Sequence, residues 1–139
     1  MRKANYDRFP STKISGTVIQ GWENICSLLE EHLKAYPALA VDFYTGIYEE
    51  EVINELRRLS PALFIDTRDL MKPESEIKAM TARFMTDDVL FGYVTNITLN
   101  DYFDQDKLKK AREEVIATKG KVVVVGSGAA MVVPAEAGL

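Results

Sequence analysis

The chain has 139 residues, of which 47% are apolar, and this size and composition suit one folded core. The net charge of -4 and the scattering of the basic residues argue against a nucleic-acid surface. A single cysteine, Cys26, excludes intrachain disulfides and thiolate zinc clusters. It also predicts a reducing compartment, which we expect to be the cytoplasm.

The first 20 residues read as an N-terminal arm, and residues 21–139 as one α/β domain. The arm is polar and contains Pro10, although alternation over 13–20 leaves a short strand open as an alternative. No apolar run reaches the roughly 18 residues that a transmembrane helix needs, so we expect no membrane contact. At the other end, residues 131–133 look like the start of a further extended segment. We therefore expect the domain to be truncated at its C-terminal end.

Helices and strands are predicted to alternate through the first half of the domain. Apolar residues at three- and four-residue spacing predict a helix over 21–36, which Pro37 ends. The apolar run 38–44 predicts a buried strand, and a second helix follows over 48–59. Its acids lie at its start and its arginines at its end, which suits the helix dipole. Residues 62–65 predict another buried strand.

The second half continues in the same way. Pro73 suits the first turn of a third helix, and β-branched and aromatic residues over 89–99 predict one strand or a hairpin. Asp104 is a good N-cap for a fourth helix that ends at Gly120. The residues expected to face inward from these helices are Ile77, Met80, Phe84, Leu108, Ala111, Val115 and Ile116.

Four consecutive valines, 122–125, are too few to span a membrane and too apolar for an edge strand. They predict an interior strand that is buried on both faces. The alternating order of elements then predicts an α/β fold with three layers, in which a largely parallel sheet carries helices on both faces.

Candidate ligand-binding residues gather where the predicted strands end, because ligands usually meet the carboxyl ends of strands in such a sheet. These residues are Asp42, Thr45, Gly46, Asp66, Arg68, Asp69, Gly126, Ser127 and Gly128. We expect their loops to converge if the strands are neighbours.

Each candidate also has a structural interpretation. The loop from Asp42 to Gly46 lacks the lysine of a phosphate loop, and the acids that follow it would repel an anion. The turn 126–128 is half of a dinucleotide fingerprint, or else a tight turn. The cluster 66–69 offers a grip for a hydroxyl-rich or phosphorylated ligand, or else a salt-bridged loop. Asp42 needs a hydrogen-bonding partner or solvent, and that partner is either structural or functional.

The remaining reactive residues carry little chemistry. His32 is the only histidine and lies beside two glutamates on a predicted helix, which indicates a solvated surface residue rather than a metal ligand. Cys26 has helical spacing with Trp22 and Leu29, and we expect it in the core. No serine has the histidine and acid of a hydrolase triad.

Four segments carry a family resemblance: AVDFYTG (40–46), LSPALFIDTRDLM (59–71), MTDDVLFGYVTNITLNDYFD (85–104) and KVVVVGSGAAMV (121–132). They resemble the N-terminal part of bacterial class I mannose-6-phosphate isomerase-like proteins. In that group an α/β domain similar to nucleoside kinases precedes a cupin-like isomerase domain. The resemblance implies a degenerate P-loop domain, with 42–46 in the place of the phosphate loop.

The resemblance leaves two hypotheses for function. The first is an accessory domain of a sugar-phosphate isomerase-like protein that binds a nucleotide or sugar phosphate, or serves assembly with a cupin domain or with other copies of itself. The second is a divergent nucleoside or sugar phosphotransferase that uses Asp42 and Asp66. One histidine cannot supply the ligands of a zinc isomerase, so this chain shows no cofactor, and zinc would belong to the absent cupin domain.

Overall fold

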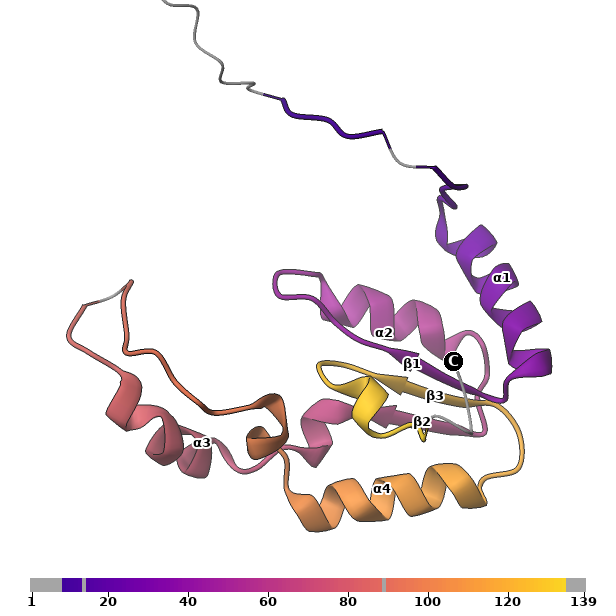
Figure 1. Ribbon diagram of the computed structural model, residues 1–139. Coiled ribbons are helices and arrows are strands. Elements are labelled where there is room, and N and C mark those ends of the chain that lie inside the picture. The colour runs from indigo at the N-terminus through magenta and orange to yellow at the C-terminus, as the bar shows by residue number, and fades with distance from the viewer. Residues whose placement is uncertain (1–8, 14, 89, 135–139) are drawn as a thin grey trace, which may run out of the picture.

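The computed structural model describes residues 9–13, 15–88 and 90–134, and its centre is a parallel sheet. The strands are β1 (Ala38–Val41), β2 (Leu63–Asp66) and β3 (Val122–Val125), each four residues long. Their order is β1-β3-β2, so the last strand in the sequence lies between the other two (Figure 1). The predicted interior valine strand is thereby confirmed.

Helices cover both faces of this sheet, as expected for a mixed α/β fold. On one face, α1 (Trp22–Ala35) and α2 (Glu49–Arg57) pack against Val123 and Val125, mainly through Leu33, Ile53 and Leu56. On the other, α4 (Gln105–Ala117) packs against Val122 and Val124 through Leu108, Ala111 and Val115. The four valines are at most 2% exposed because each face of β3 meets its own helical layer. Among the described residues, no helix is long and apolar enough to cross a membrane.

Local sequence signals fix several of these boundaries. The Asp104 side chain caps α4 by accepting hydrogen bonds from the backbone N–H groups of Asp106 (3.0 Å) and Lys107 (3.1 Å). The first helix ends before Pro37 as predicted, and β1 begins at the next residue. Cys26 packs against the α1–α2 side of the core, and burial raises the pKa of its thiol. His32 is exposed, as predicted.

Some predicted extended segments are not strands. Residues 13 and 15–20 form none, Ile14 lies outside the described residues, and β1 ends at Val41 rather than at 44. Residues 131–133 do not begin a new extended segment either. Met131 closes a 3-10 helix, η4 (Ala129–Met131), and the two valines after it are buried in the core. These valines face the α4 side of the sheet, so their apolar character reflects burial in a turn.

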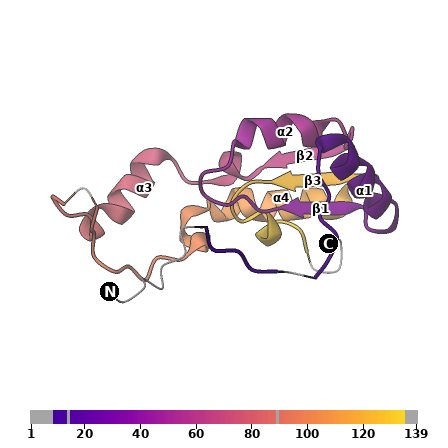
Figure 2. The ribbon, with the colours of Figure 1, turned by 90° about the horizontal axis from the view of Figure 1, so that it is seen from above.

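The segment between β2 and α4 departs most from expectation. It begins with the 3-10 helix η1 (Thr67–Leu70) and ends with η3 (Leu99–Tyr102). Between them, α3 (Glu74–Thr81), η2 (Ala82–Phe84) and the described residues that follow project away from the sheet in both views (Figures 1 and 2).

Several inward-facing predictions in this half of the chain are wrong. No residue of α3 or η2 is buried, so Ile77, Met80 and Phe84 are only partly covered. The described residues 90–99 contain no strand, and Val89 lies outside the described residues. Ile116 on α4 is 68% exposed. The periodicity of α3 was correct for a helix, but no sheet lies beneath that helix to bury its apolar face.

Candidate functional site

The carboxyl ends of the strands bring Asp42 and the turn after β3 together. One Asp42 carboxylate oxygen accepts hydrogen bonds from the backbone N–H groups of Gly128 (2.6 Å) and Ala129 (3.1 Å). The other oxygen accepts one from Ala130 at 3.1 Å. Successive N–H groups that converge in this way form an anion-binding nest, and the chain's own carboxylate occupies it. Asp42 therefore has a backbone partner 86 residues away.

Close packing holds this turn in place. Gly126 has a φ of +114°, and a Cβ built there would lie 2.1 Å from the Oγ1 atom of Thr67. Thr67 is fully buried, and among the described residues its hydroxyl has no hydrogen-bonding partner. Only glycine allows the turn to approach η1 so closely. The structure therefore has a tight turn at 126–128, one of the two alternatives that the sequence left open.

A second polar cluster joins the end of β2 to the start of α2. The Nε atom of Arg68 donates to both carboxylate oxygens of Asp66, at 3.0 and 2.9 Å. Its Nη1 atom reaches Glu50 at 3.0 Å and Glu49 at 3.4 Å. Arg68 thus binds carboxylates from two elements, and its side chain remains 47% exposed. This is the salt-bridged loop that the sequence left open as an alternative.

Hydrogen bonds between Asp66 and Arg68 shift the pKa values of both groups. Burial alone would raise the pKa of Asp66, but hydrogen bonds from the side chain and backbone of Arg68 outweigh it and hold the pKa below its usual value. Hydrogen bonds to Asp66 and then to Glu50 raise the pKa of Arg68 above its ordinary value. Asp66 therefore stays ionised and Arg68 stays cationic at neutral pH.

Of the other predicted site residues, Thr45, Gly46 and Asp69 lie apart from these two clusters, and Ser127 lies in the turn after β3. Thr45 and Gly46 are exposed in the loop between β1 and α2, and a Cβ built on Gly46 would meet no described heavy atom within 4 Å beyond the glycine and its two chain neighbours. Ser127 is also exposed. The backbone carbonyl of Asp69 accepts a hydrogen bond from Lys107 at 3.0 Å, so this residue faces α4. The sheet edge thus gathers Asp42, Asp66, Arg68 and the turn 126–128.

This edge is poorly equipped to hold a phosphate. The N–H groups of the turn already bind Asp42, and the guanidinium of Arg68 already binds carboxylates. Glu49 and Glu50 add negative charge at the start of α2, where a phosphate would need positive potential. No group of three or more metal-binding side chains occurs among the described residues. What remains is a set of polar contacts that join the loops to one another.

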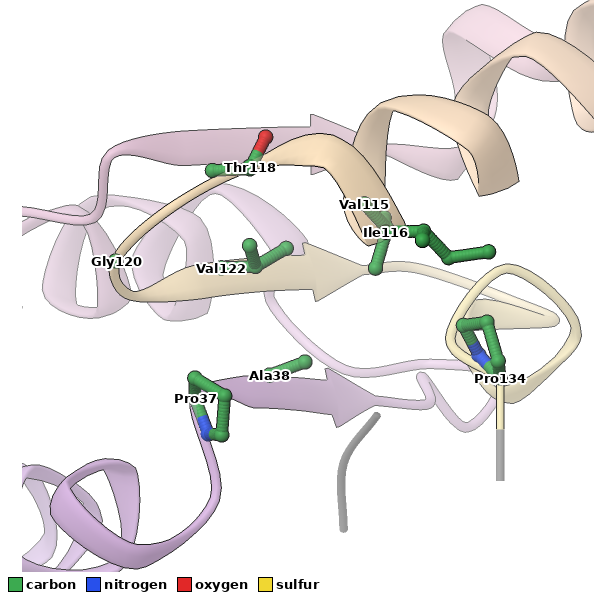
Figure 3. A pocket seen from close by; sticks show the side chains of 8 residues that line it. All are labelled: Pro37, Ala38, Val115, Ile116, Thr118, Gly120, Val122 and Pro134. Carbon is green, nitrogen blue, oxygen red and sulfur yellow. The ribbon is translucent and has the colours of Figure 1, made fainter. Parts of the chain in front are cut away.

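A hollow lies at the opposite edge of the sheet, where the strands begin. It measures about 420 Å³ and is mainly apolar. Its lining residues are Pro37, Ala38, Val115, Ile116, Thr118, Gly120, Val122 and Pro134 (Figure 3). The Thr118 hydroxyl already donates to the carbonyl of Glu114 at 2.7 Å. The pocket therefore offers apolar contact but little polar recognition, and none of the predicted site residues lines it.

The projecting segment contains a surface that the sequence analysis missed. We call the described residues 84–88 and 90–94 the apolar loop. Its exposed large side chains are Met85 (68%), Leu90 (82%), Phe91 (72%), Tyr93 (68%) and Val94 (97%). The signal that would have identified a loop is Asp87-Asp88 and Gly92 within a β-like run, because these residues favour turns over strand interiors.

The comparisons with known proteins give a family and no function. The chain matches no curated protein sequence and no solved structure. Residues 21–139 match the model of a family described as a domain of unknown function, DUF8485. Because this match covers most of the chain, the protein belongs to the DUF8485 family.

Proposed function

We propose that this chain is an accessory domain that acts in protein assembly, within a mannose-6-phosphate isomerase-like protein of the cytoplasm. The parentage rests on the resemblance of the four segments given above. Its nucleoside-kinase-like part would supply contacts, while the isomerase chemistry and any zinc would belong to a cupin-like domain of such a protein. The fold supports this role because its polar groups at the sheet edge serve the fold itself.

The observation that carries the proposal is the Asp42 carboxylate in the nest of Gly128, Ala129 and Ala130. In a phosphate-binding domain these N–H groups would be free to receive the ligand's oxygens. A phosphate would have to displace the Asp42 carboxylate, which directly follows β1. Arg68 would also have to leave Asp66 and Glu50. Both exchanges oppose nucleotide or sugar-phosphate binding.

A divergent phosphotransferase is the second candidate, and one observation favours it. Asp42 and Asp66 follow or end the strands on either side of β3, so two carboxylates flank one loop. Phosphoryl transfer, however, depends on cations that stabilise the transferring group. The described part of this edge has Arg68 in ion pairs and acids at the start of α2, so the assembly role is the better supported.

Thermal unfolding of the full chain with ATP-Mg, uridine, mannose 6-phosphate and fructose 6-phosphate tests the proposal. We expect no stabilisation, since a ligand at 100 times its Kd would add about 2.7 kcal/mol and raise the midpoint visibly. Asp42→Asn serves as the matched variant, because it keeps an oxygen in the nest and removes the charge. Phosphoryl transfer from ATP, or a ligand-induced shift that Asp42→Asn alters, would overturn the assembly role.

A further inference from the structure

The apolar loop reverses the usual arrangement of a surface loop, in which polar side chains face water. The Asp88 carboxylate accepts hydrogen bonds from the backbone N–H groups of Leu90 (2.8 Å) and Phe91 (3.1 Å). The Thr86 hydroxyl donates to the carbonyl of Phe91 and accepts from the N–H of Asp88 at 3.2 Å. Both polar side chains therefore form hydrogen bonds within the loop, while its large apolar side chains are exposed to solvent.

Backbone contacts give the loop a defined shape. The N–H of Tyr93 donates to the carbonyl of Phe84 at 2.8 Å and closes the loop at its base. A Cβ on Gly92 would lie 2.6 Å from that same carbonyl oxygen, so a glycine is needed for the close approach. A loop that is already ordered loses less conformational entropy when a partner binds it. These two contacts therefore restrict the backbone at the base of the loop before any partner binds.

The exposed area is large for a monomer and matches what a dimer needs. Two aromatic side chains of about 150–250 Å² each and three aliphatic ones, 68–97% exposed, amount to roughly 600 Å² of mainly apolar surface. Monomeric proteins rarely expose more apolar surface than this in one patch, and the five side chains lie within ten residues of the chain. Two such loops in contact would bury about 1,200 Å², which reaches the lower limit of stable protein interfaces.

We infer that the apolar loop docks on the apolar loop of a second copy of this chain, around a two-fold axis. This inference rests on the proposed assembly role and identifies the partner in assembly as a second copy of the chain. A two-fold contact uses the same patch on both copies, so one patch of this size suffices. Asp88 keeps its charge while it accepts these hydrogen bonds, so the contact has to leave the exposed Asp87 and Asp88 of each copy at its rim.

The first test measures the mass of the full chain by sedimentation equilibrium, from about 1 μM to about 1 mM, where a weak dimer forms and dissociates. Phe91→Asp should raise the dimer dissociation constant by about 30-fold or more, because it places a charge in the centre of an apolar contact. Ile116→Asp is the matched control, since Ile116 is as exposed as Tyr93 but lies on α4. It should leave the dissociation constant unchanged.

The second test changes the shape of the loop but keeps its apolar side chains. In Gly92→Ala the new methyl group would meet the Phe84 carbonyl oxygen, so the loop must open. We expect the dimer to weaken by about tenfold, as for a contact that depends on pre-organisation. An unchanged dimer would overturn the docking of a pre-shaped loop.

Cross-linking locates the axis. Val94 is 97% exposed, so in Val94→Cys two thiols at the contact should lose their hydrogens to added oxidised glutathione and form an intermolecular disulfide. Ile116→Cys and the unchanged protein, with only Cys26, should form far less. A chain that stays monomeric throughout, or dimers that survive Phe91→Asp or cross-link equally through Ile116→Cys, would overturn the inference. Those results differ from ATP turnover or a phosphate-induced shift, which would overturn the assembly role itself.

Discussion

At the carboxyl edge of the sheet, Asp42 binds N–H groups of a turn that is 86 residues away. In the apolar loop, Asp88 binds N–H groups only two and three residues along the chain. The same chemistry therefore has opposite consequences. The long-range contact ties β1 to the turn after β3 and belongs to the folded core. The short-range contact shapes a loop whose apolar side chains contribute nothing to the core, so changes there should affect association and not stability.

The largest expected effect comes from filling the space beside Gly126. Gly126→Ala should reduce the free energy of unfolding by about 2–4 kcal/mol, because the methyl group overlaps Thr67 and the backbone has a positive φ. Urea unfolding measures this loss. In the Thr67→Ala background the loss should be smaller, since the overlapping hydroxyl is gone. An equal loss in both backgrounds would show that Thr67 is not what the turn packs against.

Removing the carboxylate from the nest should have the next largest effect. Asp42→Ala leaves the N–H groups of Gly128, Ala129 and Ala130 without their partner and should cost about 1–2 kcal/mol. Amide hydrogen exchange at these positions should accelerate in the same variant. Asp42→Asn, which keeps an acceptor oxygen, should lose less. Unchanged amide exchange in Asp42→Ala would show that the Asp42 carboxylate does not hold the turn after β3 in place.

A smaller effect is expected at the exposed ion pairs. Arg68→Ala should cost no more than about 1 kcal/mol at neutral pH, because exposed pairs are weak. The pKa of Asp66 is lower in the folded protein than in the unfolded chain, so its contribution to stability is present above about pH 4 and is lost as the pH falls further. Unfolding curves between about pH 7 and pH 3 should therefore be less pH-dependent in Arg68→Ala. An identical pH dependence would exclude this pair as a source of acid sensitivity.

The smallest expected effect on stability comes from a substitution in the apolar loop. Phe91→Asp should change the free energy of unfolding of the monomer by no more than about 0.5 kcal/mol, as for other exposed positions away from the core. Urea unfolding at a concentration that keeps the chain monomeric is the measurement. Val124→Ala, in the centre of β3, provides the contrast and should cost about 2 kcal/mol. A large loss in Phe91→Asp would mean that the loop packs on its own core.

The elements of the core could be predicted because their signals are local. Four valines in a row need burial on both faces, and Asp104 marks the start of α4 by a contact within three residues. The faces of α3 could not be predicted from periodicity. The pattern of Ile77 and Met80 gives a helix but does not reveal whether a sheet lies beneath it.

The sequence predicted where the candidate site residues lie, but not which of their polar groups are already bound to one another. Parallel strands place Asp42, Asp66 and Gly126 at the carboxyl edge of the sheet. The alternation of helices and strands in the sequence already indicated such a parallel sheet. That Asp42 fills the nest depends on a tertiary contact, which no local pattern encodes. The second part of the apolar loop was expected to be a strand or a hairpin because its composition is β-like. In the structure Thr86 donates a hydrogen bond to the carbonyl of Phe91, and Asp88 accepts one from the N–H of Leu90, in another conformation.

The position of β3 bears on how the chain reaches its native state. Both β1 and β2 pair with β3 and not with each other, although they precede it in the sequence. During synthesis on the ribosome neither strand has a parallel neighbour until Val122–Val125 has emerged. The nascent chain must therefore keep β1 and β2 without their native neighbour until β3 is made, and both apolar segments are open to wrong pairing in that interval.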